Sequence, residues 1–444
     1  MPHRHPFAAL GAGLLAALVT LVAQGLAAQE VARPVAVAAR IADDGETARI
    51  AFDLSGPVSA DAHALVDPDR IVVDMAEVNF QIDPSVGRPT AARGDAIVKT
   101  FRFGLLGPGR SRVVVDLAKP ACVASVEMTP IAKGAAASRL TIELKRCEAS
   151  AFAAAAREQG SGAAAAVVAT AGGPPAGAPV IVLDPGHGGV DGGAYGADGA
   201  IEKTLVYEYA LELQRRLEAT GRYKVAMTRH GDEFVSLDDR VRLAREAGAA
   251  LLISIHADML PGASADVAGA TVYTCSERAS DAEAAHFAAR ENAADKAAGV
   301  EAKAQAPGVA DILFDLERRE TRAYAHIFSR DLIGQLQGAA RLNHNPERSA
   351  GFVVLKAPDF PSVLVELGYL SNAKDVQALN SPEWRGRAAG AMVEAVDRFF
   401  APATRASASA QAKLGALATP DSSPTAAPAT EPLAPPADGP AAPR

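Results

Sequence analysis

The sequence predicts a multidomain chain. An N-terminal all-β domain, a small sandwich, precedes a C-terminal α/β domain with a mostly parallel central sheet flanked by helices. Three observations predict this fold. Residues 29–148 carry short runs in which apolar and polar residues alternate, residues 179–400 carry apolar runs separated by longer amphipathic stretches, and an alanine- and glycine-rich stretch lies between them. Alternation with a period of two is typical of half-buried strands, and strands that alternate with helices are typical of a parallel sheet.

Residues 1–28 have the features of a secretory signal peptide. A short leading region with Arg4 precedes an apolar run from Phe7 to about Val22, and small residues follow, so cleavage is expected near Ala28. A retained membrane anchor is the alternative, but the run is barely long enough to span a bilayer and contains Gly-Ala-Gly in its first half. We therefore expect an exported protein with no membrane span after cleavage.

The first domain, residues 29–148, contains two of the three cysteines of the chain. Its expected strands lie in the runs TARIAFDLSGPV, DRIVVDMAEV, VKTFRFGLL, SRVVVDLAK and RLTIELKR. Cys122 and Cys147 lie in this one segment, and oxidising compartments favour disulfides, so these two cysteines are the candidate pair. Two buried thiols are the alternative, because the sequence alone does not give the distance between them.

Two further segments differ in composition from the domains. Residues 149–178 are rich in alanine, glycine and proline without alternation, as expected of a flexible linker. Residues 401–444 are rich in proline and alanine and are expected to be a disordered tail. The net charge of −8 and the absence of a basic cluster in the sequence argue against a nucleic-acid partner.

The second domain, residues 179–400, is expected to have apolar strands covered on both faces. The expected strands are PVIVLD, KVAMTR, ALLISIHAD, GATVYTC, GFVVLK and SVLVELG. The stretch KTLVYEYALELQRRLEA places apolar residues at every fourth position, which predicts an amphipathic helix. About 220 residues of this kind suffice for one α/β domain with a substantial core.

Four polar residues stand out at the expected strand ends and at the first helix. His187 follows the first strand in a glycine-rich turn, His256 and Glu366 end two other strands, and Glu202 begins the helix after the turn. In open α/β sheets, functional groups gather beyond the carboxyl ends of the strands. The glycine-rich turn could approach a phosphate or a metal ion, but it lacks the lysine and hydroxyl residue of a phosphate-binding loop.

Two histidines and a carboxylate are the ligands of a catalytic zinc, which keeps a fourth position for water. His187, Glu202 and His256 are therefore the candidate ligands, and Glu366 is left for the role of base. Taken singly, each residue has an ordinary explanation: His187 as a hydrogen-bonded loop residue, Glu202 as an acid in the first turn of a helix. Four such residues at one predicted rim favour the metal site.

These residues lie in segments that resemble a known family. LDPGHGG, IEK, SIHAD, ARENAAD and GFVVLKAPDFPSVLVELGYLSN together resemble the zinc-dependent N-acetylmuramoyl-L-alanine amidases that cleave septal peptidoglycan in Gram-negative bacteria. The β-rich residues 29–148 resemble the AMIN domain that accompanies these enzymes and targets them to the cell wall. The resemblance implies zinc bound by His187, Glu202 and His256, Glu366 as the catalytic glutamate, peptidoglycan as the substrate, and the periplasm as the compartment.

An insertion at about residues 277–340 is rich in alanine and charge. Its composition alone predicts a pair of solvated surface helices. The resemblance implies more: an autoinhibitory helix would cover the site and Glu291 would bind the zinc until an activator protein removes it. Asp258 of SIHAD stands where many relatives have asparagine, and we interpret it as a tolerated neighbour.

Two other functions compete with the amidase. A catalytically silent peptidoglycan-binding protein would have the same domains, but intact His187, Glu202, His256 and Glu366 argue against it. A metallopeptidase that acts on stem-peptide crosslinks would more often show a helical H-E-x-x-H motif, and the sequence has none.

Overall fold

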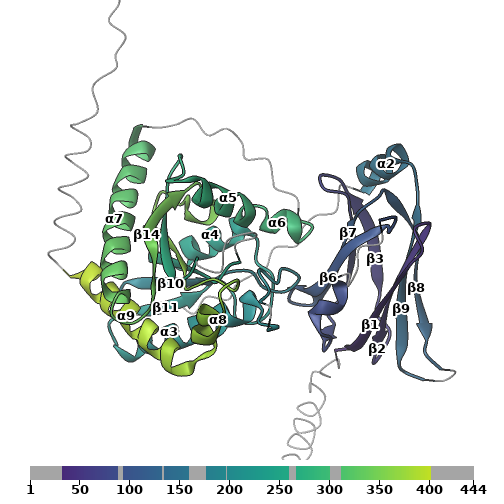
Figure 1. The fold of residues 1–444 in the computed structure, drawn as a ribbon, viewed down its shortest axis with the longest axis horizontal. Helices are drawn as coiled ribbons and strands as arrows, with labels where there is room; N and C mark the ends of the chain where they lie inside the picture. The colour runs from purple at the N-terminus through teal and green to yellow at the C-terminus, as the bar shows by residue number, and fades with distance from the viewer. Residues whose placement is uncertain are drawn as a thin grey trace, which may run out of the picture.

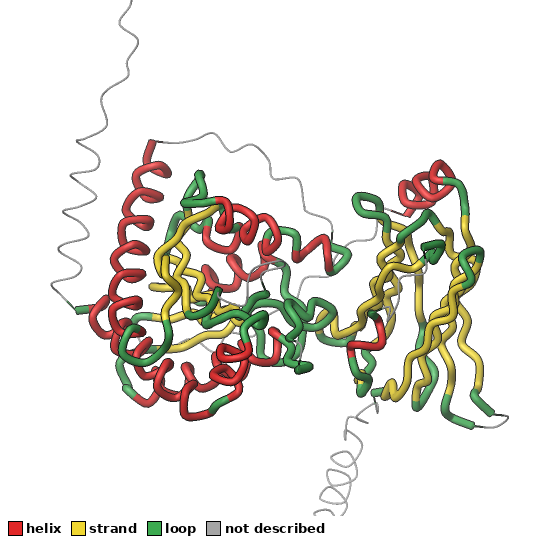
Figure 2. The backbone as a smooth tube through the Cα atoms, in the orientation of Figure 1, coloured by secondary structure: helices red, strands yellow, loops and turns green. Residues whose placement is uncertain are grey.

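The computed structural model describes residues 33–88, 94–132, 135–159, 177–196, 198–259, 267–300 and 312–401. Two domains, one all-β and one α/β, lie side by side in Figures 1 and 2, as the sequence predicts. The expected signal peptide and the expected tail beyond residue 401 lie outside the described residues. Among the described residues, no helix combines the length and the apolar character needed to cross a membrane.

The N-terminal domain is a sandwich of two sheets. The first sheet has the order β5-β1-β2-β9-β8 and the second has the order β3-β4-β7-β6. The strands are β1 (Val35–Asp43), β2 (Thr47–Leu54), β3 (Ala60–Leu65), β4 (Arg70–Ala76), β5 (Asn79–Phe80), β6 (Val98–Gly107), β7 (Arg110–Leu117), β8 (Ala121–Pro130) and β9 (Ser138–Arg146), with a short 3₁₀ helix, η1 (Pro84–Gly87), between β5 and β6. Phe52 of the first sheet meets Phe101 and Phe103 of the second, with ring centroids 6.0 and 5.6 Å apart, so the core lies between the sheets.

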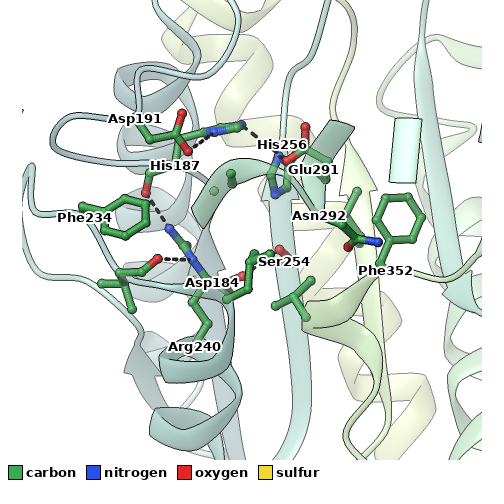
Figure 3. A pocket seen from close by; sticks show the side chains of 16 residues that line it. Asp184, His187, Asp191, Phe234, Arg240, Ser254, His256, Glu291, Asn292 and Phe352 are labelled. Atoms are coloured by element: carbon green, nitrogen blue, oxygen red, sulfur yellow. Dashed lines mark hydrogen bonds and ion pairs between the residues drawn. The ribbon is translucent and has the colours of Figure 1, made fainter. Parts of the chain in front are cut away.

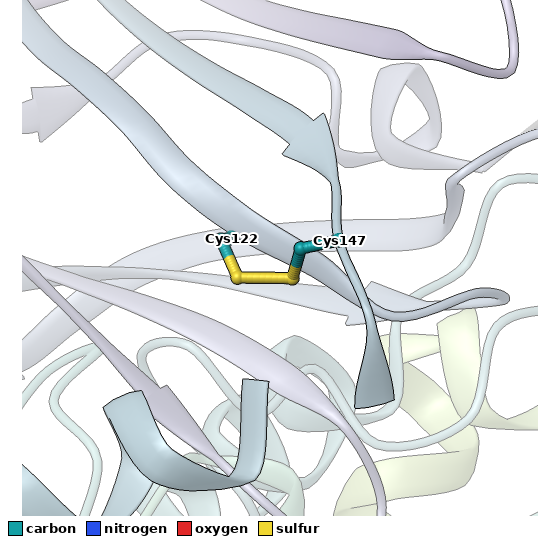
Figure 4. The surroundings of a disulfide bond; sticks show 2 residues. All are labelled: Cys122 and Cys147. Atoms are coloured by element: carbon teal, nitrogen blue, oxygen red, sulfur yellow. A yellow bond between two sulfur atoms is a disulfide. The ribbon is translucent and has the colours of Figure 1, made fainter. Parts of the chain in front are cut away.

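A disulfide and a helix close the end of this domain. Cys122 of β8 and Cys147, which follows β9, form the disulfide shown in Figure 4. The expected flexible linker begins instead with a helix, α2 (Ala149–Gln159). Alanine favours the helix, and Phe152, 1% exposed, anchors it in the sandwich core. Residues 160–176 of the expected linker lie outside the described residues.

The C-terminal domain is built on one sheet with the order β11-β10-β12-β15-β13-β14. Its strands are β10 (Val180–Pro185), β11 (Lys224–Met227), β12 (Ala249–His256), β13 (Ala270–Cys275), β14 (Leu342–Ala350) and β15 (Ser362–Glu366). Neighbouring strands are parallel except β13 and β15, which are antiparallel. The fold class predicted from the sequence, a mostly parallel sheet flanked by helices, is confirmed.

Helices cover both faces of this sheet. Successive residues of a strand point to opposite faces, so Ile181 and Leu183 pack on one layer whereas Val182 packs on the other. The first layer contains α3 (Glu202–Ala219), α7 (Ile312–Leu336) and α9 (Pro382–Phe400), and the second contains α4 (Leu237–Glu246) and α5 (Ala282–Glu291). Two short helices complete the domain, α6 (Ala294–Ala297) after α5 and α8 (Ala373–Asn380) before α9.

One predicted strand is wrong. GFVVLK is not a strand but a turn that contains a 3₁₀ helix, η2 (Val353–Leu355), and its apolar side chains fill the second core layer. The strand is the preceding segment, β14, which carries Pro346. A proline is tolerated there because β14 lies at the sheet edge and its register with β13 shifts around this residue. A short buried apolar run does not by itself distinguish a strand from a turn that packs into the core.

Candidate metal centre

The structure brings all four predicted site residues to one rim of the sheet. His256 and Glu366 end adjacent parallel strands and are partners in register. Glu202 is the first residue of α3, and His187 lies two residues beyond the end of β10. Figure 3 shows His187 and His256 with Glu291 at a pocket lined also by Asp184 and Arg240.

The glycines of the His187 turn are needed because side chains of the site leave no room for another Cβ. A Cβ at Gly186 would lie 2.4 Å from the His256 ring, and a Cβ at Gly193 would lie 2.6 Å from both Glu202 Oε2 and the His187 ring. His187 itself has a φ of 59°, in the left-handed region that costs energy for a residue other than glycine. The turn therefore folds tightly around the imidazole and aims it at His256 and Glu202.

The carboxylates of Glu202 and Glu291 both approach the same two ring nitrogens. Glu202 Oε1 lies 3.1 Å from His187 Nε2 and 3.2 Å from His256 Nδ1. Glu291 Oε2 lies 3.7 and 3.4 Å from the same two nitrogens. The ligand atoms of His187, His256 and Glu291 all lie within 4.8 Å of one another, and all three residues are buried. Such a set of donors is the kind that binds zinc.

Two observations show that a metal ion fits these residues. His187 Nε2 is buried and makes no hydrogen bond with the described residues, although two carboxylates lie close to it. Burial alone lowers the pKa of His187, but Asp191, Glu202 and Glu291 hold that pKa well above its usual value. The carboxylates of the site are therefore stabilised by a positive charge beside them. A bound metal ion provides that charge while the His187 imidazole stays neutral.

Both carboxylate oxygens of Glu202 accept hydrogen bonds from backbone amides. It is fully buried, with Oε2 accepting a hydrogen bond of 2.8 Å from the Ala194 amide and Oε1 accepting one of 2.9 Å from the Ala257 amide. Burial raises its pKa, but His187 and His256 together bring the pKa well below the usual value. Glu202 is therefore an ionised carboxylate held in place against both histidines.

Glu366 has the properties of a base. It is fully buried, and its Oε2 accepts a hydrogen bond of 2.8 Å from the Asp258 amide. Its Oε1 has no partner among the described residues. Burial and the negative charges of Glu202 and Glu291 raise its pKa well above the usual value. One oxygen is thus held in place, and the other is free to accept a proton.

Sequence reasoning missed the residues that hold the His187 turn. Asp191 Oδ2 lies 2.9 Å from His187 Nδ1, so it can accept a hydrogen bond from Nδ1–H, which leaves Nε2 unprotonated for a metal. Arg240 Nη2 donates to the His187 carbonyl over 2.7 Å, and Arg229 donates to the carbonyls of Pro185 and Gly186. The acid four residues after the histidine was the only signal in the sequence for this network.

The insertion packs on the catalytic sheet. Ala284, Phe287 and Ala288 of α5 are buried in the second core layer, and Glu291, the last residue of α5, is 7% exposed. A solvated surface helix therefore does not describe α5. Arg290 forms an ion pair with Asp258 and donates to the Met259 carbonyl. Asp258, interpreted from the sequence as a tolerated neighbour, therefore has a partner on α5.

Known families and proteins resemble this chain over both of its domains. A model of the family N-acetylmuramoyl-L-alanine amidase matches residues 181–398, and a model of the AMIN domain matches residues 38–144. The amidase AmiC of Escherichia coli O6:H1 is 31% identical over 380 residues, which cover 82% of this chain and 89% of that protein. The amidase AmiA of Escherichia coli K12 is 38% identical over 225 residues, 50% of this chain and 77% of that protein. The solved catalytic domain of the amidase CwlV from Bacillus (Paenibacillus) polymyxa var. colistinus is 24% identical, covers 50% of this chain and 97% of that chain, and gives a TM-score of 0.36. This chain belongs to the N-acetylmuramoyl-L-alanine amidase family and carries an N-terminal AMIN domain.

Proposed function

We propose that this N-acetylmuramoyl-L-alanine amidase hydrolyses the bond between the lactyl group of N-acetylmuramic acid and the L-alanine of the stem peptide, with zinc held by His187, Glu202 and His256. The observation that carries the proposal is that Glu202 Oε1 lies within 3.2 Å of both His187 Nε2 and His256 Nδ1, on the rim where Glu366 ends its strand. Peptidoglycan remodelling and the separation of daughter cells are the processes that such an activity serves.

Glu366 is proposed to move the protons of the reaction. When bound, a zinc ion supplies the Lewis acid that polarises the scissile carbonyl and acidifies water. Glu366 Oε1, which has no partner among the described residues, accepts a proton from the attacking water as its oxygen bonds to the carbonyl carbon. The same carboxyl then returns that proton to the leaving nitrogen as the C–N bond breaks. A raised pKa suits a residue that acts as base and then as acid.

Glu291 is proposed to be an inhibitory ligand. Its Oε2 lies 3.4 Å from His256 Nδ1 and 3.7 Å from His187 Nε2, close enough to share a metal ion with them. A carboxylate in the fourth position takes the place of the catalytic water. We propose that an activator protein moves α5, and Glu291 with it, away from the metal.

Two further roles belong to the N-terminal part of the chain. We propose that residues 1–28 export the chain to the periplasm and that the AMIN domain binds peptidoglycan.

Digestion of purified peptidoglycan sacculi tests the reaction. Sacculi are incubated with residues 29–444, and the released fragments are weighed by mass spectrometry while bound zinc is measured. We expect stem peptides with a free N-terminal L-alanine, and loss of activity by about 10²- to 10⁴-fold with zinc retained in Glu366→Ala. Cuts inside the stem peptide would instead indicate a metallopeptidase, and loss of zinc in Glu366→Ala would make Glu366 a ligand.

A second comparison tests the inhibitory ligand. Glu291→Ala is expected to raise the rate of sacculus solubilisation without any partner by on the order of ten-fold or more, because the closed form loses its bond to the metal. Glu277→Ala is the matched control, since Glu277 is an exposed acid of the same insertion. Equal rates for Glu291→Ala and wild type would remove the inhibitory role. No cleavage by any variant would favour the catalytically silent protein.

A further inference from the structure

The second sheet of the AMIN domain contacts the catalytic domain at the metal centre. Figure 1 shows β6 and β7 on the side of the sandwich that faces α6. One face of this sheet meets two parts of the catalytic domain. One part is the His187 turn, and the other is the segment formed by α5, α6 and the residues up to 300, which we call the inhibitory segment (residues 282–300).

The contact with the His187 turn is a close approach of two backbones. A Cβ at Gly189 would lie 1.8 Å from the Leu105 carbonyl oxygen, and a Cβ at Gly104 would lie 2.4 Å from the backbone of Gly189. The Phe234 amide donates to the same Leu105 carbonyl over 3.2 Å. Val190 and Phe234 are buried in one cluster with apolar residues of the AMIN sheet. The AMIN domain therefore sits on a fixed part of the metal centre.

The contact with the inhibitory segment consists of two arginines. Arg102 of β6 donates to the Ala297 carbonyl from Nε over 3.0 Å and from Nη2 over 2.6 Å. Arg112 of β7 donates from Nη1 to the Ala298 carbonyl over 3.1 Å and to the Gly299 carbonyl over 2.7 Å. These carbonyls lie at the C-terminal end of α6 and just beyond it. The last carbonyls of a helix have no partner within the helix, and positive charge is favourable there.

Both arginines are oriented by carboxylates of their own sheet. Asp116 of β7 binds Arg102 through both oxygens, and Asp74 of β4 binds Arg112 in the same way. Arg112 is only 6% exposed. Charge-assisted bidentate pairs are among the stronger protein hydrogen bonds, and they fix each guanidinium before it meets the segment.

The end of the segment is shaped to fit this sheet. Ala298 is fully buried against the AMIN sheet, and a Cβ at Gly299 would lie 2.7 Å from Val72 Cγ2. Gly299 also has a φ of 71°, which favours glycine. The distance in sequence from Glu291 to these contacts is only a few residues, so movement of α5 away from the metal must also move the contacts with Arg102 and Arg112.

We propose that the AMIN domain is a latch for the inhibitory segment: its docking holds Glu291 at the metal centre, and its undocking favours release. This inference rests on the proposed inhibitory role of Glu291. It follows by linkage that a ligand that binds the AMIN domain better when it is undocked raises amidase activity, without contact with the metal centre. Peptidoglycan that covers the face containing Arg102 and Arg112 is a ligand of this kind.

The test is the double variant Arg102→Ala/Arg112→Ala in the full exported chain. We expect backbone amides of residues 282–300 to exchange with deuterium faster by on the order of ten-fold or more, in the metal-free protein as well, since the loss of even one of the four hydrogen bonds to a charged group is worth about ten-fold. Basal solubilisation of sacculi should rise by a similar factor. Arg49→Ala/Arg139→Ala is the matched control, because both arginines pair with acids within the other AMIN sheet.

Two further measurements keep the outcomes distinct. Deuterium exchange of β1, β2 and β9 reports whether the AMIN domain of the arginine double variant remains folded. If that domain unfolds, the variant Asp74→Asn/Asp116→Asn is used instead, because it keeps both arginines and removes the carboxylates that orient them. If Glu291→Ala raises activity but both latch variants exchange and cleave like wild type, the latch is refuted and the inhibitory role stands. If Glu291→Ala has no effect while the latch variants still expose the segment, the inhibitory role fails and the docking contact stands.

Discussion

The two sides of the metal centre are held in different ways. The hydrogen bonds that hold His187, Glu202 and His256 come from the catalytic domain, through backbone amides and buried arginines that donate to the His187 turn, and the AMIN sheet packs on the outside of that turn at Gly189. Glu291 arrives on a separate helix, held by Arg290, which is one-third exposed, and by contacts that cross to another domain. If the proposed ligand roles are right, the comparison teaches that permanent ligands and a removable one differ in where their supports lie.

The packing of α5 agrees with a removable ligand. Phe287 is its one large buried apolar side chain, in contact with Tyr273 and Phe352 at ring-centroid distances of 5.2 and 5.3 Å. The other apolar residues that α5 buries are alanines. Burying one phenylalanine contributes only about 1.5–3 kcal/mol to the packing of α5. Contacts with a partner protein could offset a free energy of this size. The ligands on the fixed side, by contrast, are part of the core of the domain.

Removal of a permanent ligand should have the largest effect. His256→Ala is expected to lose both zinc and amidase activity, because a catalytic site with three protein ligands has none to spare. Glu291→Ala, on the removable side, should keep its zinc. Metal content after dialysis, measured beside sacculus digestion, checks both variants. Undiminished zinc in His256→Ala would refute the ligand assignment and with it the division into two sides.

Removal of a support on the permanent side should have a smaller effect. Arg240→Met loses the hydrogen bond to the His187 carbonyl and the buried ion pair with Asp184. We expect zinc affinity to fall by roughly 10- to 100-fold, as for other outer-shell partners, and the free energy of unfolding to fall by about 3 kcal/mol. Chelator competition and denaturant unfolding measure the two quantities separately.

Arg245→Met is the matched control for that variant. Arg245 lies on the same helix and pairs with Asp359 at the surface, where an ion pair contributes about 0–1 kcal/mol. Zinc affinity unchanged in Arg240→Met would show that the His187 turn does not depend on this arginine and that the fixed side is fixed by something else.

The sequence could predict which candidate ligands come together but not the residues that support them. His256 and Glu366 interrupt apolar strand ends, and parallel strands bring such ends together, so pattern and topology suffice. Arg240 and Arg229 lie on segments whose sequence is ordinary, and their role exists only because the chain brings them back to the His187 turn. The contacts of Arg102 and Arg112 with the inhibitory segment could not be predicted from the sequence either, because they join residues nearly two hundred positions apart.

Local composition also misled at two places. Residues 149–159 have the alanine content of a linker and also of a helix, and a single buried phenylalanine, Phe152, decides between them. GFVVLK has the composition of a buried strand, but β14 already occupies the place beside β13. In both cases, packing partners distant in sequence decide the conformation, and no window of local sequence contains them.

The smallest expected effect concerns pH and the removable side. Asp295 of α6 lies in the inhibitory segment, and its Oδ1 accepts a hydrogen bond of 3.0 Å from the Leu237 amide at the start of α4. Burial raises its pKa to about 6, helped by the charges of Asp238 and Asp191 and opposed by the Leu237 amide and Arg240. Release of the segment exposes Asp295 and returns its pKa toward the ordinary value.

The direction of the effect follows from this difference in pKa. The closed form binds the proton more tightly than the open form, so closure is most favourable below the ordinary pKa and becomes less favourable as the pH rises through about 6. Deuterium exchange of residues 282–300, corrected for the intrinsic pH dependence, should therefore show more opening at about pH 7 than at about pH 5. Asp295→Asn keeps the acceptor for Leu237 but does not titrate, so this part of the pH dependence should vanish in the variant. Other titrating groups contribute equally to both proteins, and only the difference between them reports on Asp295. If the two proteins open with the same pH dependence, Asp295 does not sense closure, and the removable side is held by the arginines and by Glu291 alone.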